Sequence, residues 1–127
     1  MELKNDFSSI RAWAQERGLY AKGDTKTQFL KLSEEFGELG KAIMNQNAEE
    51  VKDAIGDMVV VLTNLTELAN RDIFVQKDAI WMEKGQKRMG DIPGEVTIEE
   101  CINSAYRVIQ NRKGRMENGT FIKNREV

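Results

Sequence analysis

Two short acidic segments carry the side chains of this sequence that are best suited to chemistry. Their members are Glu34, Glu35, Glu38, Glu50, Asp53 and Asp57. Residues three or four positions apart share one face of a helix, so each segment can present a line of carboxylates. Carboxylate oxygens suit hard cations, chiefly Mg²⁺, Mn²⁺ and Ca²⁺. The alternative interpretation is an ordinary solvated helix face, which charge patterns of this kind also produce.

The residue types that are absent or rare in the chain exclude several catalytic mechanisms and metal sites. The 127 residues include no histidine and a single cysteine, Cys101. This composition excludes Ser-His-Asp and Cys-His mechanisms, His-ligated zinc and the Glu-x-x-His di-iron site of helical bundles. It also excludes an intramolecular disulfide. Any catalysis must therefore use carboxylates, Lys, Arg, Tyr or hydroxyl groups.

Charge and hydropathy indicate a single cytoplasmic domain. The sequence has 19 basic and 21 acidic residues, a net charge of -2 that does not suit a protein that coats nucleic acid. No apolar run is long enough to span a membrane, and the first six residues do not resemble a signal peptide. We therefore expect neither a nucleic-acid nor a membrane partner.

The pattern of helix formers and breakers predicts an all-α fold. We predict a single domain over residues 1–127, built as a four- to five-helix bundle of mostly antiparallel helices. Residues 72–96 are expected to be an insertion, and residues 115–127 a tail. Thr97 and Glu100 form a capping box, which opens the last helix. The predicted helices cover residues 7–17, 25–45, 49–69, 75–88 and 97–111.

On the second predicted helix, the apolar positions fall on one stripe that must face the core. Its members are Phe29, Leu32, Phe36, Leu39 and Ile43. Glu34 lies nearly opposite this stripe and is expected to be solvated. Glu35 and Glu38 flank the stripe one turn apart, so we expect both to lie beside the buried side.

The third predicted helix is apolar on nearly all sides from Met58 to Leu62, which indicates the central helix of the bundle. The residues expected to face the core are Val51, Ile55, Met58, Leu62, Leu65 and Ala69. Beside them on the helix runs a line of polar residues, Glu50, Asp53, Asp57 and Asn64. Asp57 adjoins the most apolar stretch, so we expect it to be partly buried. Antiparallel packing of the second and third helices would bring Glu35 and Glu38 towards Asp53 and Asp57. Such a cluster repels itself unless it holds cations or protons.

Three stretches of the sequence resemble the MazG-like all-α nucleotide pyrophosphohydrolases, in particular small phage and bacterial members. The stretches are Glu34-Glu35-Phe36-Gly37-Glu38-Leu39, Asp53-Ala54-Ile55-Gly56-Asp57-Met58 and Arg112-Lys113-Gly114-Arg115-Met116-Glu117-Asn118-Gly119. The resemblance covers most of the chain apart from residues 72–96. It implies Mg²⁺-dependent hydrolysis of a nucleoside triphosphate to the monophosphate and pyrophosphate, with Mn²⁺ as a substitute cation. It also implies a homodimer or homotetramer with active sites near the interface.

Family members hold magnesium with an E-E-x-x-E motif on one helix and an E-x-x-D motif on the next. By position, Glu35, Glu38 and Asp57 match these ligands, but Ala54 stands where the second motif has a carboxylate. We expect Asp53 to replace that ligand, with Glu50 as the next candidate. The general base is expected to be Glu34 or Glu35, and Glu38 completes the catalytic set.

The remaining candidates concern the substrate. Arg112, Lys113 and Arg115 are candidate phosphate ligands. The alternative is that these cations are solvated and interact only with the negative C-terminal end of the helix dipole. Weaker candidates for contact with the base are Trp13, Gln28 and Asn64.

Three functions remain open at this point. The first is a nucleotide-pool enzyme acting on nucleoside or deoxynucleoside triphosphates. The second keeps the fold and changes the substrate to phosphoribosyl-ATP, dUTP or dCTP. The third is a catalytically silent helical dimerisation module, which the departure at Ala54 favours.

Overall fold

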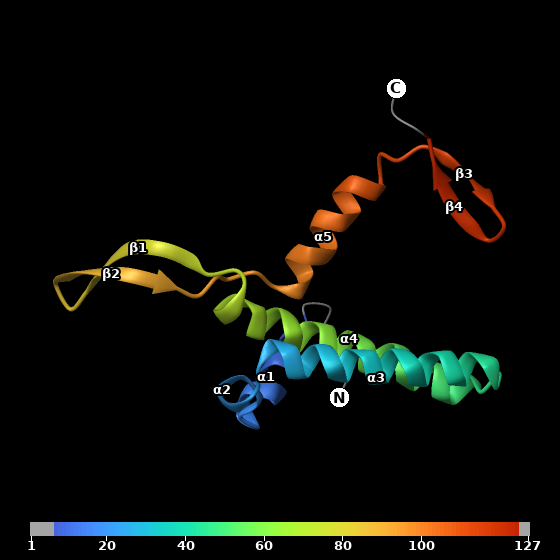
Figure 1. Ribbon diagram of the computed structural model, residues 1–127, viewed down its shortest axis with the longest axis horizontal. Coiled ribbons are helices and arrows are strands. Elements are labelled where there is room, and N and C mark those ends of the chain that lie inside the picture. Colours follow the sequence, from blue (N-terminus) through green and yellow to red (C-terminus); the bar gives the residue numbers. More distant parts are fainter. Residues whose placement is uncertain (1–6, 125–127) are drawn as a thin grey trace.

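The computed structural model describes residues 7–124 and shows helices followed by two β-hairpins (Figure 1). The N-terminal half contains four helices. They are α1 (Ser8–Glu16), α2 (Leu19–Lys22), α3 (Thr25–Met44) and α4 (Ala48–Asp72). The C-terminal half contains β1 (Gln76–Glu83), β2 (Gln86–Ile92), α5 (Ile98–Ile109), β3 (Gly114–Glu117) and β4 (Thr120–Lys123).

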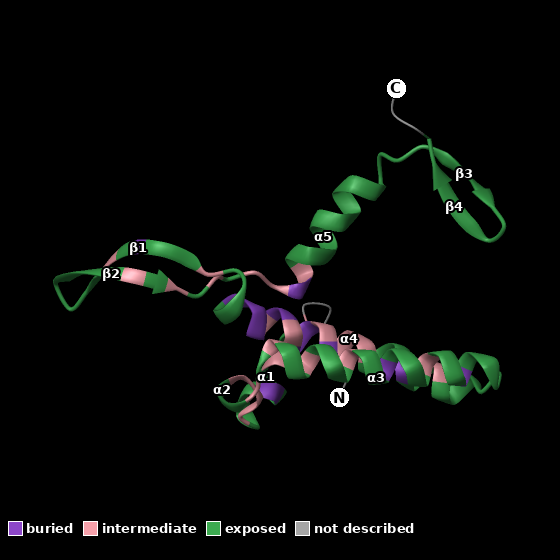
Figure 2. Cartoon of the chain, viewed as in Figure 1, coloured by how far each residue is buried: buried purple, intermediate pink, exposed green. Residues whose placement is uncertain are grey.

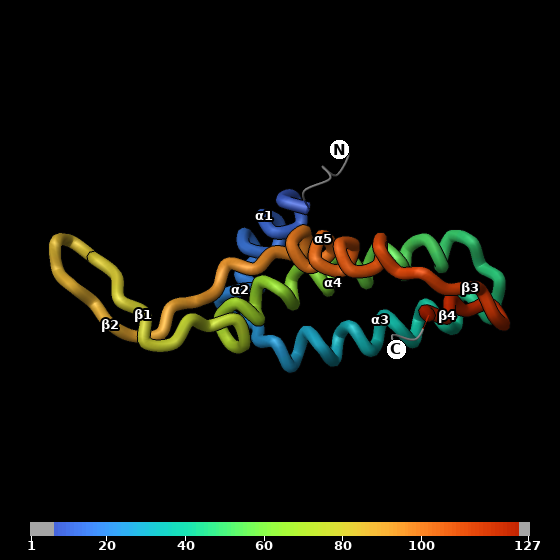
Figure 3. Tube along the Cα trace, turned by 90° about the horizontal axis from the view of Figure 1, so that it is seen from above, coloured from blue at the N-terminus to red at the C-terminus, as the bar shows by residue number. Residues whose placement is uncertain are grey.

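Helices α3 and α4 form an antiparallel pair, which is the framework of the chain (Figures 1 and 3). The Asp24 side chain caps α3 by accepting a hydrogen bond from the Thr27 amide at 2.8 Å, and Asn47 caps α4 through the Glu50 amide at 3.1 Å. The connection is short because Gln46 adopts a positive φ of 52°. Both helices begin and end within a few residues of their predicted bounds.

Helix α4 is the central helix, as predicted, because α1, α2, α3 and α5 all pack against it. The buried side chains gather along the C-terminal half of α4 and beneath α1 (Figure 2). Ala14 of α1 and Leu68 of α4 are almost fully buried. Beyond this centre, much of the chain is exposed.

The prediction of an all-α fold is wrong, because two antiparallel hairpins occupy the C-terminal half. The helix predicted over residues 75–88 is instead the β1–β2 hairpin, in which Ile80 pairs with Met89 and Trp81 with Arg88. Its turn places Lys84 and Gly85 at φ of 51° and 77°, the two positive values of a type I′ turn. A helix would instead have to accommodate Gly85 in its interior, at a cost of about 1 kcal/mol.

The predicted tail contains the second hairpin, β3–β4, within its described residues. Asn118 and Gly119 form its turn with φ of 49° and 80°. Asn-Gly is the strongest short-range hairpin signal, because both residues tolerate the positive φ values that a tight turn needs. Residues 125–127 of the predicted tail lie outside the described residues.

Helix α5 leaves the helical pair instead of completing a bundle (Figure 1). The Thr97 hydroxyl caps it by accepting a hydrogen bond from the Glu100 amide, as the capping box predicts. At its base, the Asn70 side chain makes two 2.9 Å hydrogen bonds to the Val96 backbone. Of the α5 residues, only Ile98 is buried, and the β3–β4 hairpin projects from the far end of the helix.

The chain exposes far more surface than a compact protein of its size. Its accessible area is 10326 Å², whereas a compact monomer of 14.5 kDa exposes about 6,900 Å². Large apolar side chains account for part of the excess, among them Phe36 at 67% and Tyr106 at 59% exposure. None of the helices within residues 7–124 is both long and apolar enough to cross a bilayer.

Candidate functional site

An acidic pocket of about 380 Å³ lies between α3 and α4. Helix α3 contributes Glu38, Lys41 and Asn45. Helix α4 contributes Glu50, Asp53, Ala54 and Asp57. The antiparallel pairing thus brings four of the predicted metal ligands, Glu38, Glu50, Asp53 and Asp57, to the walls of one cavity.

Glu35 lies one turn before Glu38 and is the one charged side chain among the described residues that is buried, at 5% exposure. Its Oε1 atom lies 3.3 Å from the Lys31 ammonium, while its Oε2 atom is buried without a hydrogen-bond partner. This contact with Glu35 raises the pKa of Lys31. A buried carboxylate oxygen without a partner is costly and calls for an explanation.

The pocket carboxylates share walls but do not form a ligand shell. Within residues 7–124, no three Asp, Glu, Cys or His side chains converge closely enough to hold a metal ion. Asp57 is exposed, so the expectation that it is partly buried is wrong. The reason is that it lies on the open rim of the α3–α4 pair, whereas the apolar residues that follow it turn towards neighbouring helices.

The position of Ala54 explains why its side chain is small. Ala54 is 4% exposed and lies where α4 packs against α3. Asp53 and Glu50 both line the pocket beside it, so each has access to the same space.

Three side chains at or near the pocket were not among the predicted site residues. Lys41 and Asn45 line the pocket, and Lys31 pairs with the buried Glu35. The helical repeat could have indicated Lys41 and Asn45, because they lie three and seven residues after Glu38 on the same face. Glu34 is exposed, as predicted, and lies 3.7 Å from the Lys31 ammonium.

The predicted phosphate ligands lie apart from the pocket of their own chain. Arg112 and Lys113 follow α5, and Arg115 lies in β3, where its Nε atom donates to Glu117 at 2.8 Å. All three are exposed. Figure 1 shows that α5 carries this segment away from the α3–α4 pair. Lys41 is therefore the cation that lines the pocket itself.

The predicted base contacts do not line this pocket either. Trp13 is 47% exposed, and the Arg17 guanidinium lies 4.5 Å from the centre of its ring. Gln28 is half-buried on α3. Asn64 is 2% exposed, and its Oδ1 atom accepts a 2.7 Å hydrogen bond from the Tyr20 hydroxyl.

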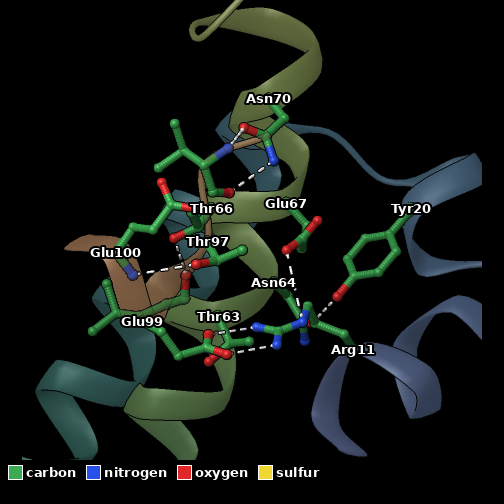
Figure 4. Close-up of polar contacts among 12 residues, drawn as sticks. Arg11, Tyr20, Thr63, Asn64, Thr66, Glu67, Asn70, Thr97, Glu99 and Glu100 are labelled. Carbon is green, nitrogen blue, oxygen red and sulfur yellow. Dashed lines mark hydrogen bonds and ion pairs between the residues drawn. The ribbon is translucent and has the colours of Figure 1, made fainter. Parts of the chain in front are cut away.

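Asn64 instead belongs to a polar cluster that joins α1, α2, α4 and α5 (Figure 4). The Arg11 guanidinium binds both oxygens of Glu99 at 2.6 and 2.7 Å, and its Nε atom lies 4.0 Å from Glu67. Burial raises the pKa of Glu67, and the Arg11 charge opposes that rise. Burial, followed by the charge of Glu67, raises the pKa of Tyr20 to about 12.

Comparison with known proteins identifies the family. Carboxylates that line a pocket between two antiparallel helices have the oxygen donors that divalent cations prefer. Residues 24–92 match the MazG nucleotide pyrophosphohydrolase domain, which covers more than half of the chain, so this chain belongs to that family. The match begins at the cap of α3 and continues through β2, so it includes most of residues 72–96.

One relative comes from Haemophilus phage HP1 (strain HP1c1) and is described as an uncharacterised 18.2 kDa protein of the rep-hol intergenic region. It is 34% identical over 76 residues, which are 60% of this chain and 47% of the relative. The chain therefore spans about half the length of this curated relative. No solved structure matches the chain.

Replacing the Tyr20 hydroxyl should produce a pH-dependent loss of stability. Tyr20→Phe leaves the buried Asn64 oxygen without its donor, so we expect the free energy of unfolding to fall by about 1–3 kcal/mol below pH 10. Because the folded pKa of Tyr20 is about 12 and the unfolded value is 10.0, the wild-type advantage is complete below pH 10. It should disappear as the pH rises from 10 towards 12.

Urea unfolding at several pH values, at one protein concentration, measures this difference. Tyr106→Phe is the control, because Tyr106 is 59% exposed and its replacement should change stability little. A difference between wild type and Tyr20→Phe that stays constant to pH 12 would contradict the prediction.

Proposed function

We propose that this protein is a Mg²⁺-dependent pyrophosphohydrolase of nucleoside or deoxynucleoside triphosphates. Water attacks the α-phosphorus, the bond from that phosphorus to the bridging oxygen breaks, and pyrophosphate leaves with the nucleoside monophosphate as the other product. Family membership supports hydrolysis of a nucleotide in general terms. The choice of a triphosphate and of Mg²⁺ is our proposal.

Two observations carry the proposal: the buried, unpartnered Oε2 atom of Glu35, and the pocket lined by four carboxylates, of which Glu38 lies one turn after Glu35. The donors are all oxygen atoms, which fits Mg²⁺ or Mn²⁺ and does not fit a soft metal. A solvated charged face would leave no carboxylate at 5% exposure. The residues present therefore fit a divalent cation, although their side chains must rotate to converge on one.

Each carboxylate has a proposed role. Glu35, Glu38 and Asp57 hold the cation, together with Asp53 or Glu50. When bound, the cation would neutralise phosphate charge and acidify the attacking water. Glu34 is exposed on the same helix, with the Lys31 ammonium 3.7 Å away, and it is our preferred general base over the buried Glu35. Lys41 supplies one positive charge at the phosphate end of the pocket.

A triphosphate needs more positive charge than Lys41 provides. Arg112, Lys113 and Arg115 are exposed and lie away from the pocket of their own chain. We propose that they bind the phosphates of a substrate held by a neighbouring copy. Arg guanidinium groups match phosphate geometry, and the hairpin on α5 gives them reach.

The exposed apolar surface supports assembly as a homodimer or homotetramer. Phe29, Phe36 and Ile43 recur every seven residues on α3 and are 58%, 67% and 55% exposed, so the expectation that this stripe faces the core of its own chain is wrong for these three residues. At about 100° per residue, this stripe lies on the side of α3 opposite Glu38. A second copy covering this stripe would leave the acidic pocket open.

A silent helical dimerisation module is the second candidate, because Ala54 removes one carboxylate of the family pattern. The exposed Asp57 is compatible with such a module. The buried, half-satisfied Glu35 argues against it, because a module without a cation has no use for such a carboxylate.

Removing the charge of Glu38 should abolish the reaction. We expect Glu38→Gln to reduce pyrophosphate release by at least about 100-fold, because it removes a cation ligand without changing side-chain size. Metal-free protein is incubated with nucleoside and deoxynucleoside triphosphates, phosphoribosyl-ATP included, with and without Mg²⁺ or Mn²⁺, and pyrophosphate is assayed.

Glu49→Gln is the matched control, since Glu49 is an exposed carboxylate on α4 that does not line the pocket. If no substrate releases pyrophosphate in a Mg²⁺-dependent reaction, the enzyme proposal is contradicted and the silent module is favoured.

The fourth ligand can be identified by comparing Asp53→Asn with Glu50→Gln. We expect Asp53→Asn to weaken Mg²⁺ activation about 10- to 100-fold and Glu50→Gln to have the smaller effect, because Asp53 lies one turn from Asp57. The measurement is the Mg²⁺ concentration that gives half-maximal rate. The reverse order would assign the role to Glu50, and no effect of either variant would remove both from the ligand set.

Assembly is tested by the mass of the protein in solution. Sedimentation should give two or four times 14.5 kDa for the native chain, because the apolar stripe on α3 must be covered. Phe36→Glu should shift the mass towards the monomer, whereas Lys26→Glu, an exposed change elsewhere on α3, should not. A native monomer would contradict the proposal.

A further inference from the structure

A second cavity adjoins the acidic pocket on the far side of α4. It has a volume of about 710 Å³. Its walls combine four residues without polar side chains, Ile10, Gly56, Val59 and Val60, with Lys52, Asp53 and Asp57. Asp53 and Asp57 also line the acidic pocket, so the two cavities meet at these carboxylates.

The helical repeat explains this arrangement. On α4, Ala54 faces α3, whereas Gly56 and Val60 lie more than 100° round the helix on the side away from α3. Asp53 and Asp57 occupy the sector between them. Ile10 of α1 is 8% exposed and forms the wall that faces Val59 and Val60.

We propose that this apolar cavity, defined by Ile10, Gly56, Val59 and Val60, holds the nucleoside part of the substrate. The inference rests on the proposed function and locates the uncharged end of the same ligand. A nucleoside triphosphate is less polar at its nucleoside end and highly charged at its phosphate end. The apolar cavity would hold the nucleoside and the acidic pocket the phosphates, with Asp53 and Asp57 between them. The volume lies within the usual range of small-molecule sites.

The composition of the cavity wall also limits base recognition. Among the described residues, the side chains that line the cavity include no amide or hydroxyl group, so the base would meet chiefly methyl groups and the Lys52 side chain. Apolar pockets discriminate weakly between ligands of similar shape, by about 10- to 200-fold. Trp13, Gln28 and Asn64 would then take no part in binding the base, because none of them lines this cavity.

Gly56 offers a direct test, because a side chain added there would enter the cavity. A Cβ atom at this position meets nothing within 4 Å, so a side chain added at Gly56 begins in open space. Replacing a helical glycine also favours the helix, so the variant is expected to fold. Gly56→Ala provides a smaller step. The control is Gly37→Leu, a helical glycine on α3 that likewise meets nothing within 4 Å and lines neither cavity.

Calorimetry in Mg²⁺ should compare a nucleoside triphosphate with a non-hydrolysable α,β-bridge against inorganic tripolyphosphate. We expect Gly56→Leu to weaken nucleotide binding by about tenfold or more, and Gly56→Ala by less. The affinity for tripolyphosphate should change by less than about twofold in both variants, and Gly37→Leu should leave the affinity for both ligands unchanged.

Three outcomes would overturn the inference. An equal loss of affinity for the nucleotide and for tripolyphosphate would mean that Gly56→Leu disturbs the acidic pocket. An unchanged affinity for the nucleotide would mean that the cavity does not bind the nucleoside. A change in sedimented mass on Gly56→Leu would assign the cavity to a contact between copies.

Failure of the proposed function is distinguishable from failure of this inference. Selective loss of nucleotide binding in a protein that releases no pyrophosphate would support the cavity and reject the reaction. Normal turnover and binding in Gly56→Leu would reject the cavity and retain the reaction. A wild-type chain that binds neither ligand would reject both.

Discussion

The burial of Glu35 in the antiparallel α3–α4 pair is the constraint on which the proposed site depends. A carboxylate at 5% exposure with one unpartnered oxygen is expensive to maintain. Lys31 compensates one oxygen only. The same helix pairing that buries Glu35 also gathers Glu38, Asp53 and Asp57 around one pocket. The packing of two helices therefore creates both the electrostatic cost and the cavity in which a cation can offset it.

The α3–α4 pair separates three environments by rotation around the helix axes. One side carries the acidic pocket, the opposite side of α3 carries an exposed apolar stripe, and the outer side of α4 carries the apolar cavity next to α1. Charge and apolar surface lie on neighbouring sides of the same two helices in this arrangement. A ligand that is charged at one end and apolar at the other can use adjacent sides, while a second copy uses the third.

The C-terminal half serves a different purpose from the helical pair. Helix α5 is fixed at its base by Asn70, through Val96, and by the Arg11–Glu99 ion pair, and it carries exposed cations on a hairpin beyond its end. The chain consequently exposes much more surface than a compact protein of equal mass. The proposed assembly would cover part of this surface, and the cations Arg112, Lys113 and Arg115 are opposite in charge to the acidic pocket.

The sequence by itself determined the bounds of α3 and α4, the central place of α4 and the solvated position of Glu34, because each follows from local periodicity and capping. The family followed from the acidic motifs and the Arg112–Gly119 segment, which resemble those of its members. The sequence also contained the two turn signals, Lys84-Gly85 and Asn118-Gly119, whose positive φ values exclude the all-α interpretation. Only the tertiary structure decided that Glu35 is buried while Asp57 is exposed, since burial depends on which neighbour packs against each face. It also decided that Asp53 and Asp57 separate two cavities, because Ile10, which forms the opposite wall, is 43 residues or more away in sequence.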